Sequence, residues 1–332
     1  MHVPQTPVTP FGFKRVWQAS IPGSKLQNIF SLKGEDGVEY ALLCDNNGSV
    51  ACLNDLGEEV WRERLVKGTI TDISASSNAD LAVITTENGI ACFDLSGCEL
   101  IKLFGNYAGV HVFDSASLIL LDSDGIAHFY QSYDCTSVKL DISDKVFSIE
   151  KCGDFAALKA ENTVFLIDCE GKSKASKVFD SKIVTVSQLA ESEHIFLSCE
   201  DGLLNVLDNN LEVLFSYKFK VPALSLTYNN ENETFFFGLQ DSTVAILQRR
   251  TGHLYKTELI GTPKSVVSHN HGAVFGTDMD QIALLTTSGQ GLAKFTFPSH
   301  LLALFPCRRQ QCLLALFEDS ISCLALLPES KS

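Results

Sequence analysis

One pattern repeats along almost the whole chain: an apolar run, a turn rich in Asp, Asn and Gly, a second apolar run, a polar turn and a third apolar run. A clear copy has its first run at Ala41–Cys44, its turn at Asp45–Gly48 and its second run at Val50–Leu53. The positions equivalent to Gly48 are Gly48, Gly89, Gly125, Asn162, Gly202, Ser242, Gln281 and Ser320. Such a repeat indicates structural units that stack on their neighbours and bury their apolar faces only together.

The apolar runs have the character of strands. They are short, rich in Val, Ile, Leu and Phe, and separated by Asn-Gly and Asp-Gly turns. In the second copy we expect four strands, at Ile70–Ser74, Leu81–Thr85, Ile90–Asp94 and Glu99–Phe104. Four-stranded repeats of about 40 residues are typical of β-propeller blades. The sequence therefore predicts an all-β fold, an eight-bladed β-propeller of four-stranded blades.

The two ends of the chain decide how the eighth blade is completed. The last copy supplies only three apolar runs before the sequence ends at Ser332. The early segment Arg15–Ala19 contains Trp17 and matches the fourth strand of the first copy, which contains Trp61. We expect the N-terminal strand to join the last three strands in a 1+3 blade, because this pairs an edge that would otherwise stay open.

This arrangement predicts a single domain over residues 1–332. The expected blades are residues 24–65, 66–104, 105–142, 143–179, 180–219, 220–259, 260–297, and 298–327 closed by 14–21.

The first copy also resembles a known repeat. Asn47-Gly48, Leu53–Gly57 and Val60-Trp61 are similar to the repeat of the PQQ-like (quinoprotein-like) propellers. That family contains quinone-dependent dehydrogenases, outer-membrane assembly factors and interaction modules. Its enzymes use an adjacent Cys pair, and no two Cys are adjacent here. The resemblance thus implies the non-enzymatic branch and no cofactor. WD40-like repeats are the second choice of family, since their Gly-His and Trp-Asp marks are missing.

Composition limits which binding partners and which cellular compartment we expect. The 26 Lys and Arg against 40 Asp and Glu give a formal charge of -14, which disfavours a nucleic-acid partner. The chain shows neither a signal peptide nor an apolar run of membrane-spanning length. Most of the 11 Cys stand inside apolar runs, as reduced core thiols do. We expect a cytoplasmic protein that does not enter the membrane.

Acidic residues recur in the turn between the second and third strands of every copy. Two interpretations remain open: Asp and Asn suit tight hairpin turns, or the carboxylates form an acidic rim for a basic partner. The candidate acidic rim is Asp45, Glu87, Asp122, Asp124, Glu161, Asp201, Asp241, Asp280 and Asp319.

Basic residues recur in the loops that enter the first strand, on the same expected face. They could form a basic collar at the channel mouth that binds an anion or an acidic peptide, or they could simply flank apolar strands as gatekeepers. The candidate basic collar is Lys25, Lys67, Lys145, Lys182, Lys220, Lys264 and His300.

The sequence offers no catalytic signature. His269-Asn270-His271 lacks a third soft ligand at a suitable spacing, and Asp122–Gly125 has the composition of a hairpin turn, so we predict no metal site. The favoured function is an intracellular binding module or scaffold for a protein or peptide partner, without enzymatic activity. The alternative is a sensor or enzyme that binds a small anionic metabolite in the Lys-lined channel mouth.

Overall fold

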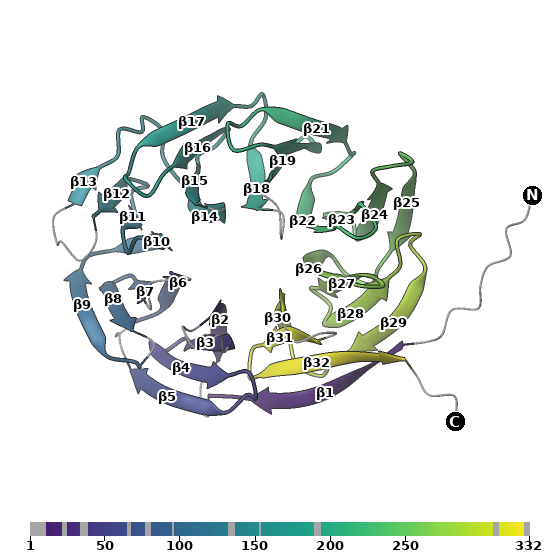
Figure 1. Ribbon diagram of the computed structural model, residues 1–332, viewed down its shortest axis with the longest axis horizontal. Helices are drawn as coiled ribbons and strands as arrows, with labels where there is room; N and C mark the ends of the chain where they lie inside the picture. Colours follow the sequence, from purple (N-terminus) through teal and green to yellow (C-terminus); the bar gives the residue numbers. More distant parts are fainter. Residues whose placement is uncertain are drawn as a thin grey trace, which may run out of the picture. The chain divides into compact units, whose positions relative to one another are not determined.

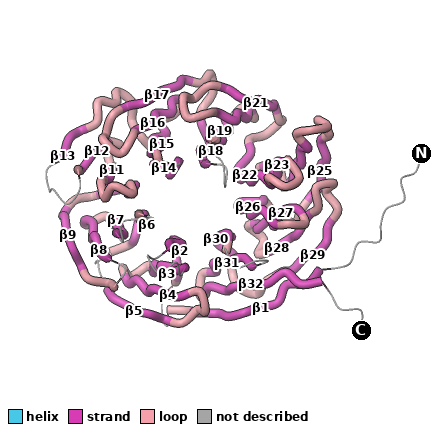
Figure 2. The backbone as a smooth tube through the Cα atoms, viewed as in Figure 1, coloured by secondary structure: helices cyan, strands magenta, loops and turns pink. Residues whose placement is uncertain are grey.

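The regular structure of the protein consists of β-strands (Figure 2). The computed structural model describes residues 11–21, 25–33, 39–64, 68–76, 81–94, 96–131, 137–152, 154–188, 194–307 and 312–328. In these residues the strands form eight four-stranded antiparallel sheets, and each sheet is one blade. The prediction of an all-β fold of eight four-stranded blades is confirmed. None of the described segments forms a helix with the length and apolar character to cross a bilayer.

The blades belong to two compact units. The first, the five-blade unit, comprises residues 19–222. Its strands are β2 Leu26–Lys33, β3 Glu39–Asp45, β4 Ser49–Asn54, β5 Glu59–Arg64; β6 Ile70–Ala75, β7 Leu81–Thr86, β8 Gly89–Asp94, β9 Glu99–Phe104; β10 Tyr107–Val112, β11 Leu118–Asp122, β12 Ala127–Tyr130, β13 Ser137–Lys139; β14 Ser148–Cys152, β15 Phe155–Lys159, β16 Thr163–Ile167, β17 Ser173–Val178; and β18 Ile183–Gln188, β19 Ile195–Cys199, β20 Leu203–Leu207, β21 Val213–Lys218.

The second unit, the three-blade unit, comprises residues 1–18 and 223–332. Its strands are β22 Ala223–Asn229, β23 Thr234–Leu239, β24 Thr243–Gln248, β25 Leu254–Glu258; β26 Pro263–His269, β27 Gly272–Thr277, β28 Gln281–Leu285, β29 Gly291–Thr296; and β30 Leu301–Pro306, β31 Cys312–Phe317, β32 Ile321–Pro328 with β1 Phe11–Ala19. The prediction of one domain over the whole chain stays a prediction.

The N-terminal strand completes the eighth blade. The strand order in that sheet is β1-β32-β31-β30, so the first and last strands of the chain lie side by side (Figure 1). The predicted 1+3 blade is therefore confirmed. The observed β1 begins at Phe11, a few residues before the expected start.

The burial of each strand follows from its place in the blade. The two middle strands are covered on both faces, so β7 and β8 are almost entirely buried and appear in the sequence as continuous apolar runs. The outer strand β9 is only partly covered and alternates between exposed and half-buried residues. Neighbouring blades share their cores: Val83 and Cys92 of one blade pack in a cluster with Val112 and Leu120 of the next. Blade packing thus supplies the hydrophobic stabilisation.

The first strand of each blade has one edge that no strand of its own sheet covers. In the five-blade unit, side chains of the preceding blade bond to that edge: Asp72 Oδ2 accepts from Val110 N at 3.0 Å, and Ser74 Oγ accepts from Val112 N at 3.0 Å. In the three-blade unit Ser265 Oγ accepts from Leu304 N at 3.2 Å. These bonds satisfy backbone groups that would otherwise lie unpaired in a packed interior, and they fasten successive blades together.

Candidate binding site

Six residues of the basic collar lie in the described part of the chain and all six are exposed. Lys67 lies outside the described residues. Backbone hydrogen bonds join the segments around the described collar residues to the turn between the second and third strands of the same blade. Asn46 N donates to the Lys25 carbonyl at 3.0 Å, and Glu318 N donates to the His300 carbonyl at 3.0 Å. The two sets of loops that the sequence places on one face therefore meet within single blades. The binding role of the collar stays a prediction.

Several carboxylates of the acidic rim are engaged in turn geometry. Asp45 is fully buried, and its Oδ1 accepts from Asn47 N at 2.8 Å and Ser49 N at 2.7 Å. Asp122 Oδ1 accepts from Asp124 N at 3.0 Å and Ile126 N at 2.9 Å. These bonds match the turn interpretation of the acidic residues. Asp45 does not face the solvent, so it cannot contribute to a surface rim.

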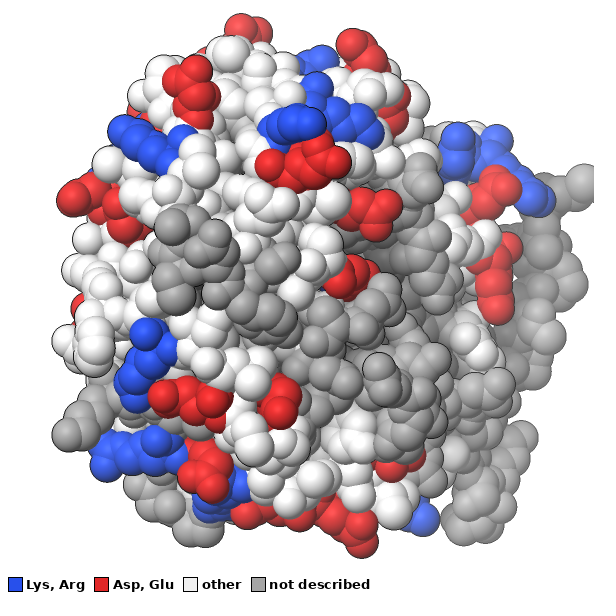
Figure 3. All heavy atoms as spheres, turned by 60° about the vertical axis from the view of Figure 1, so that its left-hand side comes forward, with Lys and Arg blue, Asp and Glu red and all other residues white. Residues whose placement is uncertain are grey.

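Rim carboxylates also contact Lys and His side chains of the protein itself. Asp201 pairs with Lys218, whose hydrogen bond lowers the pKa of the Asp201 carboxyl. His128 Nε2 lies 3.0 Å from Asp122 Oδ2. Figure 3, which brings the left-hand side of Figure 1 forward, shows acidic and basic side chains interspersed on the visible surface. On that surface the charges do not separate into zones of one sign.

A collar residue and a rim residue come within hydrogen-bonding distance in the three-blade unit. His300 Nδ1 lies 2.8 Å from Asp280 Oδ1, which also accepts from Leu301 N at 2.9 Å. Lys264 Nζ lies 4.0 Å from Asp278 Oδ2. Asp278 is held in place because its Oδ1 accepts from Thr262 N at 2.7 Å. We call Lys264, Asp278, Asp280 and His300 the charged cluster.

A cavity of about 190 Å³ opens beside the charged cluster, and Lys264, Asp278, His300 and Leu302 are among the residues that line it. Two apolar side chains in nearby parts of the sequence are exposed: Ile260, in the loop before β26, is 60% exposed, and Met279, between Asp278 and Asp280, is 58% exposed. The loop at Gly261 packs closely on the turn at Met279, since a Cβ added to Gly261 would lie 2.6 Å from Met279 Cγ. Neither Ile260 nor Met279 was predicted as a site residue, although each is an apolar residue within a polar loop or turn.

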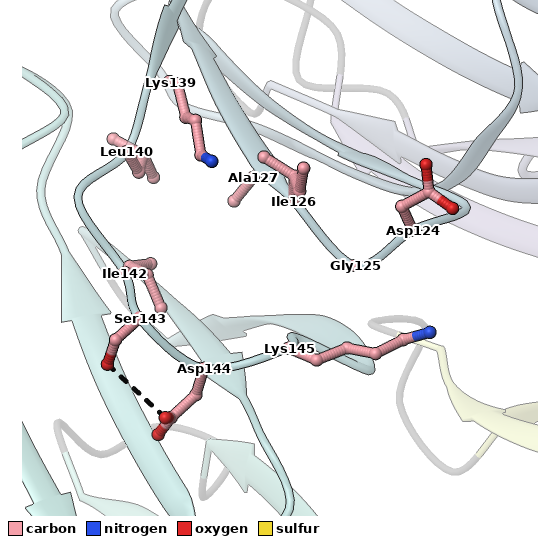
Figure 4. Close-up of a pocket in the computed structure, with 10 residues that line it drawn as sticks. All are labelled: Asp124, Gly125, Ile126, Ala127, Lys139, Leu140, Ile142, Ser143, Asp144 and Lys145. Atoms are coloured by element: carbon pink, nitrogen blue, oxygen red, sulfur yellow. Dashed lines mark hydrogen bonds between the residues drawn. The ribbon is translucent and has the colours of Figure 1, made fainter.

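A second cavity, of about 220 Å³, lies in the five-blade unit and is lined by Asp124 and Lys145 among others (Figure 4). The loop and turn are joined here too, because Val146 N donates to the Gly125 carbonyl at 3.0 Å. Figure 4 shows Ser143 bonded to Asp144, a contact of 3.4 Å, while Lys145 extends along the loop away from that pair. The lining also includes apolar side chains, among them Ile126, Leu140 and Ile142.

Two acidic residues on the inner strands of the five-blade unit were not predicted as site residues. Burial raises the pKa of Asp72 on β6 to about 6, although hydrogen bonds from the backbone N–H groups of Val110 and Ile73 act to lower it. Burial and the Asp72 charge raise the pKa of Glu150 on β14 to about 7, while Lys159 acts in the opposite direction. Lys159 Nζ donates to the Val184 carbonyl at 3.1 Å. The signal in the sequence was an acidic residue within a first strand, ITDISA for β6 and SIEKC for β14.

The His269-Asn270-His271 segment forms the end of β26 and the turn after it. The two rings lie 5.4 Å apart, and burial lowers the pKa of His269 to about 4, so this imidazole is neutral near pH 7. Within the described residues, no group of three or more His, Cys, Asp or Glu side chains is placed to hold a metal ion.

Comparisons with known proteins describe the fold. No protein-family model matches the chain. No curated protein matches its sequence. Among solved structures, BamB from Moraxella catarrhalis aligns with a TM-score of 0.73 at 12% identity, over 97% of this chain and 100% of that one. The C-terminal WD40 domain of Sif2 aligns with a TM-score of 0.71 at 11% identity, over 96% and 99%. The computationally designed Ika8 protein aligns with a TM-score of 0.71 at 15% identity, over 92% and 98%.

These likenesses and the eight four-stranded sheets define the class of protein: the chain is an eight-bladed β-propeller. The resemblance to propeller repeats that the sequence indicates is confirmed at the level of the fold.

Proposed function

We propose that the protein is a binding module without catalytic activity, and that it docks a protein segment on the charged cluster of the three-blade unit. The observation that carries this proposal is the exposure of Ile260 and Met279, two large apolar side chains more than half exposed, one in the loop that leads to β26 and one in the turn that holds Asp278 and Asp280. Protein interfaces combine an apolar anchor, often Met or an aromatic residue, with a polar rim that fixes orientation.

The charges at this site favour a partner segment that carries both signs. Lys264 and His300 could meet an acidic group, and Asp278 and Asp280 a basic one, each by exchanging its present partner. Such complementary charges determine specificity and the rate of encounter more than affinity. A cytoplasmic location and the absence of a cofactor remain predictions from the sequence.

The alternative, a small anionic metabolite as ligand, draws no support from this cluster. A carboxylate already stands against each of the two collar residues here, at 4.0 Å from Lys264 and 2.8 Å from His300. An incoming phosphate or carboxylate would be repelled by Asp278 and Asp280 at close range. A peptide with both charges avoids this repulsion.

The proposal is tested by comparing the partners that the wild type and two variants retain. The double variant Ile260→Asp/Met279→Asp removes the apolar anchor, and Leu56→Asp places the same charge at a side chain of similar exposure, 54%, in a turn between the third and fourth strands of a blade. We expect wild type and Leu56→Asp to recover the same proteins from a cell extract, and the double variant to lose them by at least about tenfold, which corresponds to about 1.4 kcal/mol.

Melting curves of the wild type and the two variants show whether each protein is folded. If the double variant is folded and still recovers the same proteins as wild type, the charged cluster is not the docking site. If Leu56→Asp also loses these proteins, the loss is not specific to the charged cluster and the proposal is wrong.

A further inference from the structure

The fourth strand of the third blade ends early. In the next blade β17 continues to Val178, which pairs with Thr163. The position equivalent to Thr163 is Ile126, but here β13 ends at Lys139, which pairs with His128. Among the described strands, none pairs with the outer edge of the chain at Ile126, and Ile126 lines the cavity of about 220 Å³ in this blade.

Hydrogen bonds within the blade hold the walls of this cavity in place. The loop after β13 is joined to the opposite wall at two points: Leu140 N donates to the Ala127 carbonyl at 3.0 Å, and Val146 N donates to the Gly125 carbonyl at 3.0 Å. The residues between these two bonds include the loop side of the cavity lining. A cavity whose walls are already held in place loses less conformational entropy when a ligand binds.

Two side chains of opposite charge stand next to each other at this cavity without forming an ion pair. The Lys145 side chain packs on Gly125, whose φ is 84°, because a Cβ added there would lie 2.5 Å from Lys145 Cγ and 3.1 Å from Lys145 Cε. Asp124 is the residue before Gly125, and Figure 4 shows Lys145 extending to the same side as Asp124. No ion pair within the described segments involves either side chain, so both charges are available to a ligand.

The rest of the lining is apolar next to this pair. Leu140 is buried, and Ile126 and Ile142 are half-buried. The remaining charged lining residues, Lys139 and Asp144, add one charge of each sign, so the cavity as a whole favours neither an anion nor a cation. Its volume is below the range of about 300–1,000 Å³ that is usual for drug-sized ligands, so we expect a smaller ligand.

These features select the class of ligand. A ligand of one sign would be repelled by one member of the Asp124–Lys145 pair at close range. An α-amino acid carries an ammonium group and a carboxylate on one carbon atom, so it can meet the aspartate with the first and the lysine with the second. An apolar side chain on the same molecule would contact Ile126 and Ile142.

We propose that this cavity is a binding site for a free α-amino acid with an apolar side chain. Lys145 holds the carboxylate of the ligand and Asp124 holds its ammonium group. The site lies in the five-blade unit, so it does not depend on docking at the charged cluster of the three-blade unit.

The test measures the binding of leucine, methionine and phenylalanine to the full chain by isothermal titration calorimetry. We expect at least one of them to bind with a dissociation constant of about 1 mM or below, a modest affinity for a ligand of roughly ten non-hydrogen atoms. The amide of that amino acid lacks the carboxylate, and its N-acetyl derivative lacks the positive charge. Each derivative should bind at least about tenfold more weakly than the amino acid itself.

Two double variants locate the site. Asp124→Asn/Lys145→Gln removes one exposed charge of each sign from the cavity and should weaken binding by at least about tenfold. Glu170→Gln/Lys172→Gln removes an exposed ion pair from a turn of the next blade and should bind like wild type. Melting curves show whether both variants are folded.

Four results would overturn the proposal. The first is that none of the three amino acids binds, and the second is that the capped derivatives bind as tightly as the amino acid, as expected of a site for a peptide segment. The third is unchanged binding in folded Asp124→Asn/Lys145→Gln. The fourth is an equal loss of binding in Glu170→Gln/Lys172→Gln, which would place the site elsewhere.

Discussion

Glu150 is a carboxyl group in a place where its charge is costly. It stands on the inner strand β14 of the five-blade unit, where burial and the nearby Asp72 raise its pKa from 4.5 to about 7. The folded protein therefore keeps a proton that the unfolded chain releases at lower pH. The resulting contribution to stability is fully present below about pH 4.5 and is lost as the pH rises through about 7.

Replacement of Glu150 by Gln should remove this pH dependence, because Gln resembles the protonated acid and stays neutral. Relative to wild type, Glu150→Gln should melt at nearly the same temperature at pH 5 and roughly 2–4 °C higher at pH 8, the shift expected for about 1 kcal/mol. Differential scanning calorimetry at both pH values measures the difference. Glu161→Gln, in an exposed turn, is the matched control for loss of one charge. An equal shift at both pH values would show that the Glu150 charge does not matter.

At the scale of elements, turns between the third and fourth strands share one hydrogen-bonding pattern. A side-chain oxygen at the end of the third strand accepts two backbone N–H groups of the turn. Asn54 Oδ1 accepts from Leu56 N at 3.0 Å and Glu58 N at 2.9 Å, and Asp94 Oδ1 accepts from Ser96 N at 2.8 Å and Cys98 N at 3.0 Å. These bonds satisfy donors that the strand ladder does not reach.

This hydrogen-bonding pattern predicts which substitutions of Asp94 are tolerated. Asp94→Ala removes the acceptor of both bonds and should lower the melting temperature by roughly 2 °C, since the two lost hydrogen bonds are exposed to water and together are worth about 1 kcal/mol. Asp94→Asn should lose far less, because Asn fills the same role at position 54. Thermal melting near pH 7 compares the two variants. Similar losses in both would mean that the charge of Asp94, and not its role as acceptor, stabilises the turn.

Most of the fold could be predicted because strand, turn and burial signals coincide in each copy. The expected strand Glu99–Phe104 has the observed bounds of β9, and Leu81–Thr85 is one residue shorter than β7. The hairpin turns are marked by glycines with positive φ, such as Gly48 at 81°, a conformation that favours glycine. These signals are local, so the sequence alone carries them.

The candidate site was less accessible to such reasoning because it depends on contacts between segments far apart in the sequence. The spacing of Lys264 and Asp278 does not reveal that Lys264, near the start of β26, lies close to Asp278 in the turn after β27. The acidic rim was inferred from the recurrence of acidic residues in equivalent turns, yet the buried Asp45 carboxylate accepts hydrogen bonds from the backbone of its own turn. Asp72 and Glu150 belong to different blades, and only the packing of inner strands brings their charges within range.

At the scale of the molecule, every sheet has edge strands whose outer backbone groups no strand of that sheet covers. An exposed strand edge invites pairing with other chains. On the inner strands, side chains such as Asp72 and Ser74 bond to the edge of the next blade. In the eighth blade the N-terminal β1 covers β32, and Phe13 of β1 packs against the cluster that contains Leu324 and Leu326. The first strand thus contributes both backbone pairing and apolar contacts.

Removal of β1 should therefore destabilise the eighth blade from its outer edge. Deletion of residues 1–20 leaves β32 without its neighbour, so we expect a lower melting temperature, faster amide exchange in β32 and concentration-dependent aggregation. Deletion of residues 1–10, which end before Phe11, is the control and should melt like the full chain if β1 itself provides the stability. Hydrogen exchange followed by mass spectrometry locates the change. Unaltered melting and unaltered protection of β32 in the longer deletion would show that the blade is stable with three strands.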